Sequence, residues 1–365
     1  MDDNMLGMPF TEIDTPALVI DLDVMEANIA VMADFFARTK AKLRPHVKTH
    51  KTPALAHKQI VAGAIGMTCA KLGEAEVMAE SGIKDILIAN QVVGRGKISR
   101  LVDLAKKADM MVAVDDLRNA GEISEVASGA GASVRVLVEV NTGINRCGVE
   151  PGKPALELAR KVFKLPGLRF SGVMGYEGHA VGIKDFNERS EVARKSMKLL
   201  TETADVIRDG GIEVRIVSGG GTGTYNISGV YPGVTEIQAG SYILMDVSYN
   251  ERCPEFGCAL TVLTTVVSIT PSQRRVVTDA GLKSMTKDFG MPGVKGYPDL
   301  SVMGLSEEHV RIEDKSGRCS LKVGDKIELI PNHVCTTVNL HDRFYGVRKG
   351  KVEAIWPIAA RGRFD

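Results

Sequence analysis

Eight short apolar runs, separated by amphipathic stretches, fill the first two thirds of the chain and constrain its fold most strongly. The runs cover residues 42–47, 65–70, 85–90, 110–115, 135–140, 170–175, 214–218 and 236–240. The stretches between them have helical spacing at residues 53–61, 74–80, 97–107, 154–163 and 187–208. Repeated strand–helix units indicate a parallel sheet, and eight of them predict a closed (β/α)8 barrel of the TIM type. An open, doubly wound sheet is the alternative.

The pattern changes after about residue 250. Strand-like segments then follow one another without long helices between them, at residues 260–269, 275–278, 326–330 and 345–348. The sequence Arg348-Lys-Gly-Lys351 is typical of a hairpin turn. We therefore expect an α/β chain with two domains: a barrel at residues 20–250, and an all-β domain formed by residues 1–19 and 251–365.

The composition excludes several classes of partner. The 46 Lys and Arg residues nearly balance the 45 Asp and Glu residues, for a net charge of +1, and aromatic residues make up only 5% of the chain. Neither value favours a nucleic acid or an anionic membrane as partner. Hydrophobic residues make up 44%, enough for a substantial core.

The cysteine content and the start of the chain bear on its location. Six cysteines among 365 residues do not form a disulfide framework. Residues 1–7 lack the basic and apolar regions of a secretory signal, and no apolar run has the length of a membrane span. These features predict a protein of the reducing cytoplasm.

The first candidate site follows the first expected barrel strand, since barrel active sites lie at the carboxyl ends of the strands. The segment Arg44-Pro-His-Val-Lys-Thr-His-Lys51 gathers cations and histidines in eight residues. A lysine enclosed in a barrel mouth beside other cations has a lowered pKa, so its amine can attack a carbonyl. Lys48 is therefore a candidate for covalent catalysis. An ordinary basic loop is the other interpretation of the segment.

The second candidate is the glycine-rich segment Ser218-Gly-Gly-Gly-Thr-Gly-Thr-Tyr225, after the seventh expected strand. Glycines let backbone N–H groups converge on an anion, and the threonine hydroxyls add donors. Barrels commonly hold a phosphate at this position. The segment therefore predicts a phosphate site, with a plain flexible turn as the alternative.

The third candidate is the pair His333 and Cys335, in the expected β domain. In an extended chain, residues two apart point to the same face. Imidazole and thiolate together suit zinc, and two protein ligands leave positions for water and substrate, as a catalytic metal requires. A buried cysteine beside a structural histidine is the other interpretation.

Taken together, these segments resemble the D-threonine aldolase and D-serine dehydratase family, whose members are fold-type III pyridoxal-phosphate enzymes with an alanine-racemase-like fold. The resemblance covers nearly the whole chain. It rests on five blocks in the right order: Arg44-Pro-His-Val-Lys48, Gly219-Gly-Gly-Thr-Gly223, Gln238-Ala-Gly-Ser-Tyr242, Asp279-Ala-Gly-Leu-Lys-Ser284 and His333-Val-Cys335.

The resemblance implies a role for each candidate residue. Lys48 would carry pyridoxal 5'-phosphate covalently, and Arg146 would face the ring nitrogen of the cofactor. Other cofactor contacts would come from Tyr176, Ser218, Gly221, Thr222, Gly223 and Tyr242. His333 and Cys335 would bind a divalent metal, with zinc favoured over manganese or magnesium, and His179 is the candidate base for the substrate hydroxyl.

The resemblance leaves two reactions open. Aldolases of the family usually carry His-x-Asp in the metal pair, and His-x-Cys is similar to the dehydratase branch. More aldolase-like are Asn339-Leu-His-Asp342, Asp279-Ala-Gly-Leu-Lys283 and the Ala-Arg-Gly tail. We expect a D-threonine aldolase type of lyase, which cleaves D-3-hydroxy amino acids to glycine and an aldehyde. The alternative is a D-serine or D-3-hydroxyaspartate dehydratase, which forms a keto acid and ammonia.

Two other functions are less well supported by the sequence. An amino-acid racemase needs a second acid–base group and no metal, and a non-enzymatic carrier of the cofactor consists of the barrel alone. The resemblance also implies a head-to-tail homodimer, in which residues 279–287 of one subunit lie near the barrel mouth of the other.

Overall fold

The computed structural model describes residues 3–365. The first two residues of the segment 1–19, which we expected in the β domain, lie outside the described residues, as do the first two of the residues 1–7 on which the expected location rests in part. The chain divides into two compact units. One consists of the residues up to Val31, Thr49–Thr52 and Ser241–Gly362, and we call it the β unit. The other consists of Met32–Lys48, Pro53–Gly240 and Arg363–Asp365, and we call it the barrel unit.

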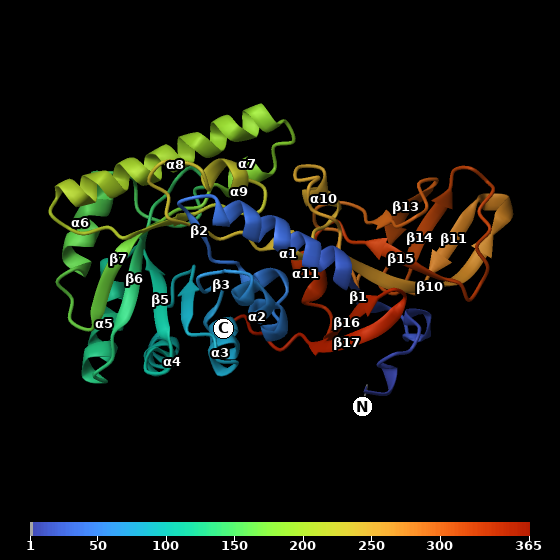
Figure 1. Cartoon of the computed structure of the whole chain (residues 1–365), viewed down its shortest axis with the longest axis horizontal. Coiled ribbons are helices and arrows are strands. Elements are labelled where there is room, and N and C mark those ends of the chain that lie inside the picture. Colours follow the sequence, from blue (N-terminus) through green and yellow to red (C-terminus); the bar gives the residue numbers. More distant parts are fainter. Residues whose placement is uncertain (1–2) are drawn as a thin grey trace. The chain divides into compact units, whose positions relative to one another are not determined.

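The barrel unit contains an eight-stranded sheet in which all pairs are parallel, in the order β2-β9-β8-β7-β6-β5-β4-β3 (Figure 1). A parallel bridge between His46 and Thr68 joins β2 to β3 and closes the sheet into a barrel. The strands are β2 (Lys42–Leu43), β3 (Met67–Cys69), β4 (Asp85–Ile88), β5 (Asp109–Val114), β6 (Val134–Glu139), β7 (Leu168–Met174), β8 (Ile216–Gly219) and β9 (Glu236–Ile237). The predicted barrel is confirmed, and the open sheet is excluded.

Helices cover the outside of the sheet (Figure 1). They are α2 (Pro53–Val61), α3 (Leu72–Glu80), α4 (Arg95–Ala105), α5 (Leu117–Gly129), α6 (Lys153–Val162) and α8 (Phe186–Asp209). The short helices α7 (Gly178–Val181) and α9 (Tyr225–Ser228) lie in the connections that follow β7 and β8. Helix α1 (Leu22–Ala37) begins in the β unit and ends in the barrel unit. Asp116 and Asp185 cap α5 and α8 by accepting hydrogen bonds from N–H groups of the first turn.

The barrel interior is built in layers because successive side chains of a strand point to opposite faces. The middle layer is an apolar cluster of Leu87, Met111, Ala113, Leu137 and Met174. Two residues beyond this layer, β5 leads to Asp115 and β6 ends at Glu139. The same alternation therefore directs both carboxylates into the carboxyl-terminal mouth of the barrel.

The β unit contains a nine-stranded sheet, in which β13-β14-β11-β10-β1-β16-β17 form one path and β15 pairs with β10 and β12. All pairs are antiparallel except β1 with β16. The strands are β1 (Ala17–Asp21), β10 (Leu260–Thr270), β11 (Arg275–Thr278), β12 (Gly293–Val294), β13 (Leu300–Leu305), β14 (Val310–Asp314), β15 (Lys326–Ile330), β16 (Arg343–Arg348) and β17 (Lys351–Pro357). Short helices α10 (Val247–Asn250) and α11 (Val334–Val338) complete the unit.

The hairpin expected at residues 348–351 joins β16 to β17, with both turn residues, Lys349 and Gly350, at positive φ. The expected all-β character of the last third is confirmed. The domain boundaries at residues 20–250 and 251–365 stay a prediction.

Candidate active site

Tyr176, in the loop after β7, brings most of the expected cofactor residues of the barrel unit together. The ammonium of Lys48 lies 5.8 Å from the centroid of the Tyr176 ring, and the guanidinium carbon of Arg146 lies 6.0 Å from it. A Cβ placed on Gly221 would lie 3.3 Å from the same ring. Lys48, Arg146 and the glycine-rich loop therefore all lie near the ring of Tyr176.

The fully buried Glu177 holds the glycine-rich loop through hydrogen bonds. The Glu177 carboxylate accepts hydrogen bonds from the backbone N–H of Gly220 at 3.1 Å and from the hydroxyls of Thr224 at 2.7 Å and Ser228 at 2.5 Å. Gly220 has a φ of +72°, a conformation that a residue with a Cβ rarely adopts. Three hydrogen bonds to one buried carboxylate therefore hold this turn in place, and its role as a phosphate site stays a prediction.

The remaining expected cofactor contacts fall in both units. Ser218 is buried at the end of β8, where its hydroxyl accepts a hydrogen bond from the Gln238 side-chain amide at 2.8 Å. Thr222 is also buried, and it lies with Gly223 in the glycine loop. Tyr242 belongs to the β unit, where it is buried with its ring centroid 5.9 Å from that of Phe256.

The structure corrects one part of the argument for Lys48. Arg44 does not contribute to a cationic loop around the lysine, because its buried guanidinium binds Glu236 at 3.1 Å and Asp85 at 2.8 Å. Burial alone would lower the pKa of Arg44, but these two carboxylates raise it. The charge of Arg44 is therefore neutralised by these two carboxylates. Lys48 lies in the 3-10 turn Val47–Thr49 that follows.

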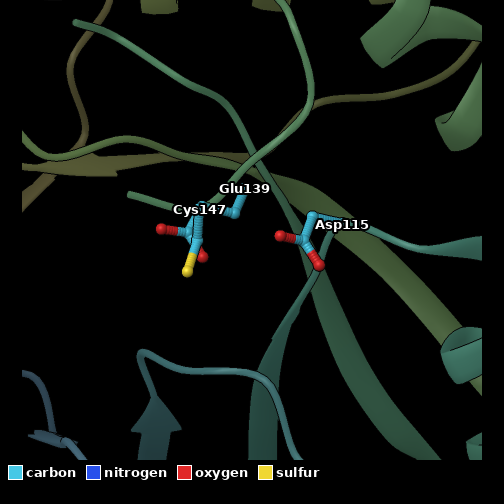
Figure 2. A group of neighbouring side chains, drawn as sticks. All are labelled: Asp115, Glu139 and Cys147. Carbon is cyan, nitrogen blue, oxygen red and sulfur yellow. The ribbon is translucent and has the colours of Figure 1, made fainter. Parts of the chain in front are cut away.

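A cluster of Asp115, Glu139 and Cys147 lies at the ends of β5 and β6, and one potential ligand atom of each lies within 4.8 Å of the others (Figure 2). Burial raises the pKa of Glu139, although its hydrogen bond from Gln91, at 2.5 Å, and the charge of Arg146 oppose the rise. Arg146 approaches Glu139 at 3.9 Å. Glu139 therefore has two partners in the barrel mouth, the Gln91 amide and the Arg146 guanidinium.

His179, the candidate base, lies in α7 with an exposed side chain. Its Nε2 is 3.4 Å from the Ser196 hydroxyl on α8. A Cβ added to Gly143 would lie 3.0 Å from its ring. The role of His179 stays a prediction.

The expected metal pair lies in the β unit, but its local structure differs from the strand we expected. His333 is extended (φ −137°, ψ 111°) and caps α11, whereas Cys335 lies inside this helix. The cause is Asp246, a buried carboxylate that accepts the Val334 N–H at 3.0 Å and so fixes the start of the helix. The strand geometry was wrong, yet the helical turn still brings the two side chains together, because Cys335 forms a hydrogen bond with His333.

Two further contacts define this pair. Burial lowers the pKa of His333, but Cys335 and Asp288 more than compensate and raise it to about 9. The Cys335 thiol also lies 3.4 Å from the Thr49 hydroxyl, which belongs to the same unit. Thr49 follows Lys48 directly in the sequence, so the metal pair contacts the residue next to the candidate lysine.

Comparison with known proteins matches both parts of the chain to families. Residues 20–247 match the family described as "Alanine racemase, N-terminal domain", and residues 259–347 match "Putative serine dehydratase domain". The chain is 40% identical to the D-threonine aldolase of Arthrobacter sp, over 98% of this chain and 95% of that protein. It is 38% identical to the 3-hydroxy-D-aspartate aldolase of Paracoccus denitrificans (strain Pd 1222), over 98% of this chain and 94% of that protein.

The chain belongs to the D-threonine aldolase and D-serine dehydratase family. This confirms the resemblance and the enzyme class, a pyridoxal-phosphate-dependent lyase. Among solved structures, the D-threonine aldolase from Filomicrobium marinum superimposes with a TM-score of 0.95 at 42% identity, covering 99% of both chains. A cysteine variant of D-threo-3-hydroxyaspartate dehydratase in a metal-free form matches with a TM-score of 0.87 at 27% identity, covering 96% of this chain and 98% of that one.

The structure adds site residues to this family member that sequence reasoning missed. Glu139 and Asp115 could have been found, since they continue the inward-facing alternation of β6 and β5. Glu177 and Asp288 gave no such signal, because each is an ordinary acidic residue in a loop.

Proposed function

We propose that the protein is a D-threonine aldolase type of lyase that cleaves D-3-hydroxy amino acids to glycine and an aldehyde. The observation that carries the cofactor part of this proposal is the convergence of Lys48, Arg146 and the glycine loop on Tyr176. The aldolase relatives, which match this chain across both units, support the same reaction.

The residues around Tyr176 fit pyridoxal phosphate. Lys48 offers an amine for the aldehyde of the cofactor, the rigid loop at Gly221–Gly223 suits its phosphate, and Arg146 suits its ring nitrogen. When bound, the cofactor supplies an electron sink for the bond that breaks at the substrate Cα. Since arginine holds its proton, Arg146 would disfavour a proton on the ring nitrogen and so would limit this sink.

The donor set of His333 and Cys335 fits a divalent metal, since the imidazole and the thiol lie together and both are typical zinc ligands. Two protein ligands leave coordination positions of the metal for water and substrate. The metal supplies a Lewis acid for the β-hydroxyl of the substrate. Thiolate favours zinc, with manganese or magnesium as alternatives. A metal-free form of a dehydratase relative supports a metal in this family.

The proton of the β-hydroxyl requires a base in the aldolase reaction. We propose His179 for this role, because a neutral imidazole can accept a proton near neutral pH. Replacement by Gln should then lower kcat with little change in cofactor absorbance. An unchanged kcat would exclude His179 and direct attention to the other groups of the barrel mouth.

A dehydratase is the second candidate, and the cysteine of the metal pair favours it. In that reaction, Lys48 would remove the Cα proton while hydroxide leaves. Incubation with D-threonine, D-serine and D-3-hydroxyaspartate distinguishes the two. Glycine with an aldehyde supports the aldolase, whereas a keto acid with ammonia supports the dehydratase. Equal turnover of the L-enantiomers would contradict both.

We also propose a homodimer of the cytoplasm. The family resemblance supports the dimer, with Asp279–Lys287 near the barrel mouth of the partner, and sedimentation at assay concentration tests it. A fully active monomer would contradict the dimer. Within the described part of the chain, all six cysteines are free. Among the described residues, no helix is both long and apolar enough to cross a bilayer.

A further inference from the structure

The imidazole of His333 is held on several sides within the β unit. Its Nδ1 lies 2.5 Å from the Oδ2 of Asp288. The ring of Phe289 stacks on it, with centroids 4.1 Å apart and planes inclined by only 6°. The Thr336 hydroxyl lies 3.2 Å from the same Nδ1. These contacts fix both the plane of the ring and its rotation within that plane.

The partners of Nδ1 also decide where its proton lies. A carboxylate only accepts hydrogen bonds, so the Nδ1 of His333 donates to Asp288. The Thr336 hydroxyl donates its proton to the other oxygen of Asp288, at 3.1 Å. A neutral imidazole carries one ring proton, and with that proton on Nδ1 the lone pair is on Nε2. A metal at His333 would therefore bind through Nε2.

The segment that carries Asp288 is itself firmly placed. The Thr286 hydroxyl lies 2.6 Å from that of Thr336, on helix α11. Earlier in the segment, the carbonyl oxygen of Ser284 accepts a hydrogen bond from Nε2 of His341 at 2.7 Å. At its start, Asp279 accepts hydrogen bonds from the Thr264 hydroxyl at 2.7 Å and the Thr265 N–H at 2.8 Å. The segment therefore holds Asp288 against His333 by several independent contacts.

We propose that Asp288 is a positioning residue of the metal site, which holds His333 in the tautomer and orientation that present Nε2 to the metal. This inference rests on the proposed metal pair, His333 and Cys335. Carboxylates placed behind a metal-binding histidine make the imidazole a stronger and better oriented ligand. Phe289 supports the same orientation through its stack.

The test is the metal affinity of Asp288 variants, measured without turnover by competition with a chromophoric chelator for zinc. We expect Asp288→Ala to weaken zinc binding by about 10–100-fold, the range found when such outer partners are removed. Asp288→Asn should lose less, since its amide oxygen can still accept the Nδ1 proton. The matched control is Asp299→Asn, an exposed aspartate of the same unit, which should bind zinc like the wild type.

Two further measurements separate positioning from a general structural role. The melting temperature of the metal-free variants should equal that of the metal-free wild type. Cobalt-loaded variants should keep the thiolate-to-cobalt absorption band, because Cys335 still binds. Zinc affinity of Asp288→Ala within twofold of the wild type, or a loss explained by a lower melting temperature, would overturn the inference.

The wild type distinguishes failure of this inference from failure of the proposed metal pair. If the wild type binds one zinc ion and Cys335→Ala does not, the metal pair stands and the Asp288 variants decide this inference alone. If the wild type binds no zinc, or if Glu139→Gln rather than Cys335→Ala abolishes binding, the metal pair is wrong and the role of Asp288 fails with it.

Discussion

Both ends of the barrel carry charged side chains, but the two ends use them differently. At the amino-terminal end, residues near the starts of the strands pair with one another. Arg44 binds Asp85 at 2.8 Å and Glu236 at 3.1 Å, and Arg135 binds Asp85 at 2.5 Å and Asp109 at 2.9 Å. Opposite charges at these distances attract one another, so the charged residues at this end form a network of ion pairs.

At the carboxyl-terminal mouth, the cations are less closely paired. Arg146 approaches Glu139 only to 3.9 Å and keeps 54% of its side chain exposed. Lys48 lies over the Tyr176 ring at 5.8 Å. Charge that is only loosely compensated in this way is available for a ligand. The comparison predicts that substitutions at the mouth reduce function and those at the opposite end reduce stability.

The largest effect should come from Lys48→Ala. The variant should lose the visible absorbance of the lysine-bound cofactor, and activity should fall by orders of magnitude, because Lys48 provides the covalent attachment. Its melting temperature in the absence of cofactor should stay near that of the wild type. Absorption spectra, product assays and calorimetry measure these quantities. If reductive labelling with borohydride marks Lys51 or Lys283 instead, the assignment of Lys48 is wrong.

The next largest effect should come from Arg44→Met, at the amino-terminal end of the barrel, and its matched variant at the mouth is Arg146→Met. Removal of Arg44 leaves the buried Glu236 uncompensated, and breaking a buried pair in this way costs about 3–5 kcal/mol. Arg146→Met should change the free energy of unfolding little but weaken cofactor binding. Chemical denaturation measures the stability of both variants, and cofactor titration measures their affinity for the cofactor. Equal losses of stability in both variants would contradict the difference between the two ends.

The sequence predicts much of this arrangement because the barrel follows a local rule. Strand–helix alternation predicted all eight barrel strands, and the alternation within β5 and β6 extends to Asp115 and Glu139. The partners of Arg44 were not predictable, since Asp85 and Glu236 are 41 and 192 residues away in the chain. The helix at Val334–Val338 was missed for a similar reason, because the buried Asp246 that starts it lies 88 residues from Val334.

A third prediction concerns Glu177, a residue of the barrel mouth that should affect both function and stability. Its carboxylate accepts three hydrogen bonds from the glycine loop region, and Glu177→Gln replaces one accepting oxygen by a donating amide. A buried donor left facing donors costs about 1–3 kcal/mol. We expect a loss of stability in this range together with weaker cofactor binding. Denaturation measures the loss of stability, and cofactor titration measures the weaker binding. If Glu177→Gln shows only one of these effects, Glu177 supports either the fold or the cofactor site, and not both.

The smallest effect should come from Arg169, at the exposed edge of the amino-terminal network. Arg169 binds Asp109 at 2.9 Å, but both side chains are about half exposed, at 51% and 47%. Exposed ion pairs contribute about 0–1 kcal/mol and weaken as salt increases. Arg169→Gln should therefore lower the free energy of unfolding by less than about 1 kcal/mol, and this difference should shrink in high salt. The loss in Arg44→Met should persist in the same salt, since its partner Glu236 is buried. Chemical denaturation at low and high salt measures the free energy of unfolding of both variants. A large, salt-independent loss of stability in Arg169→Gln would contradict this prediction and show that the exposed ion pair contributes as much as the buried one.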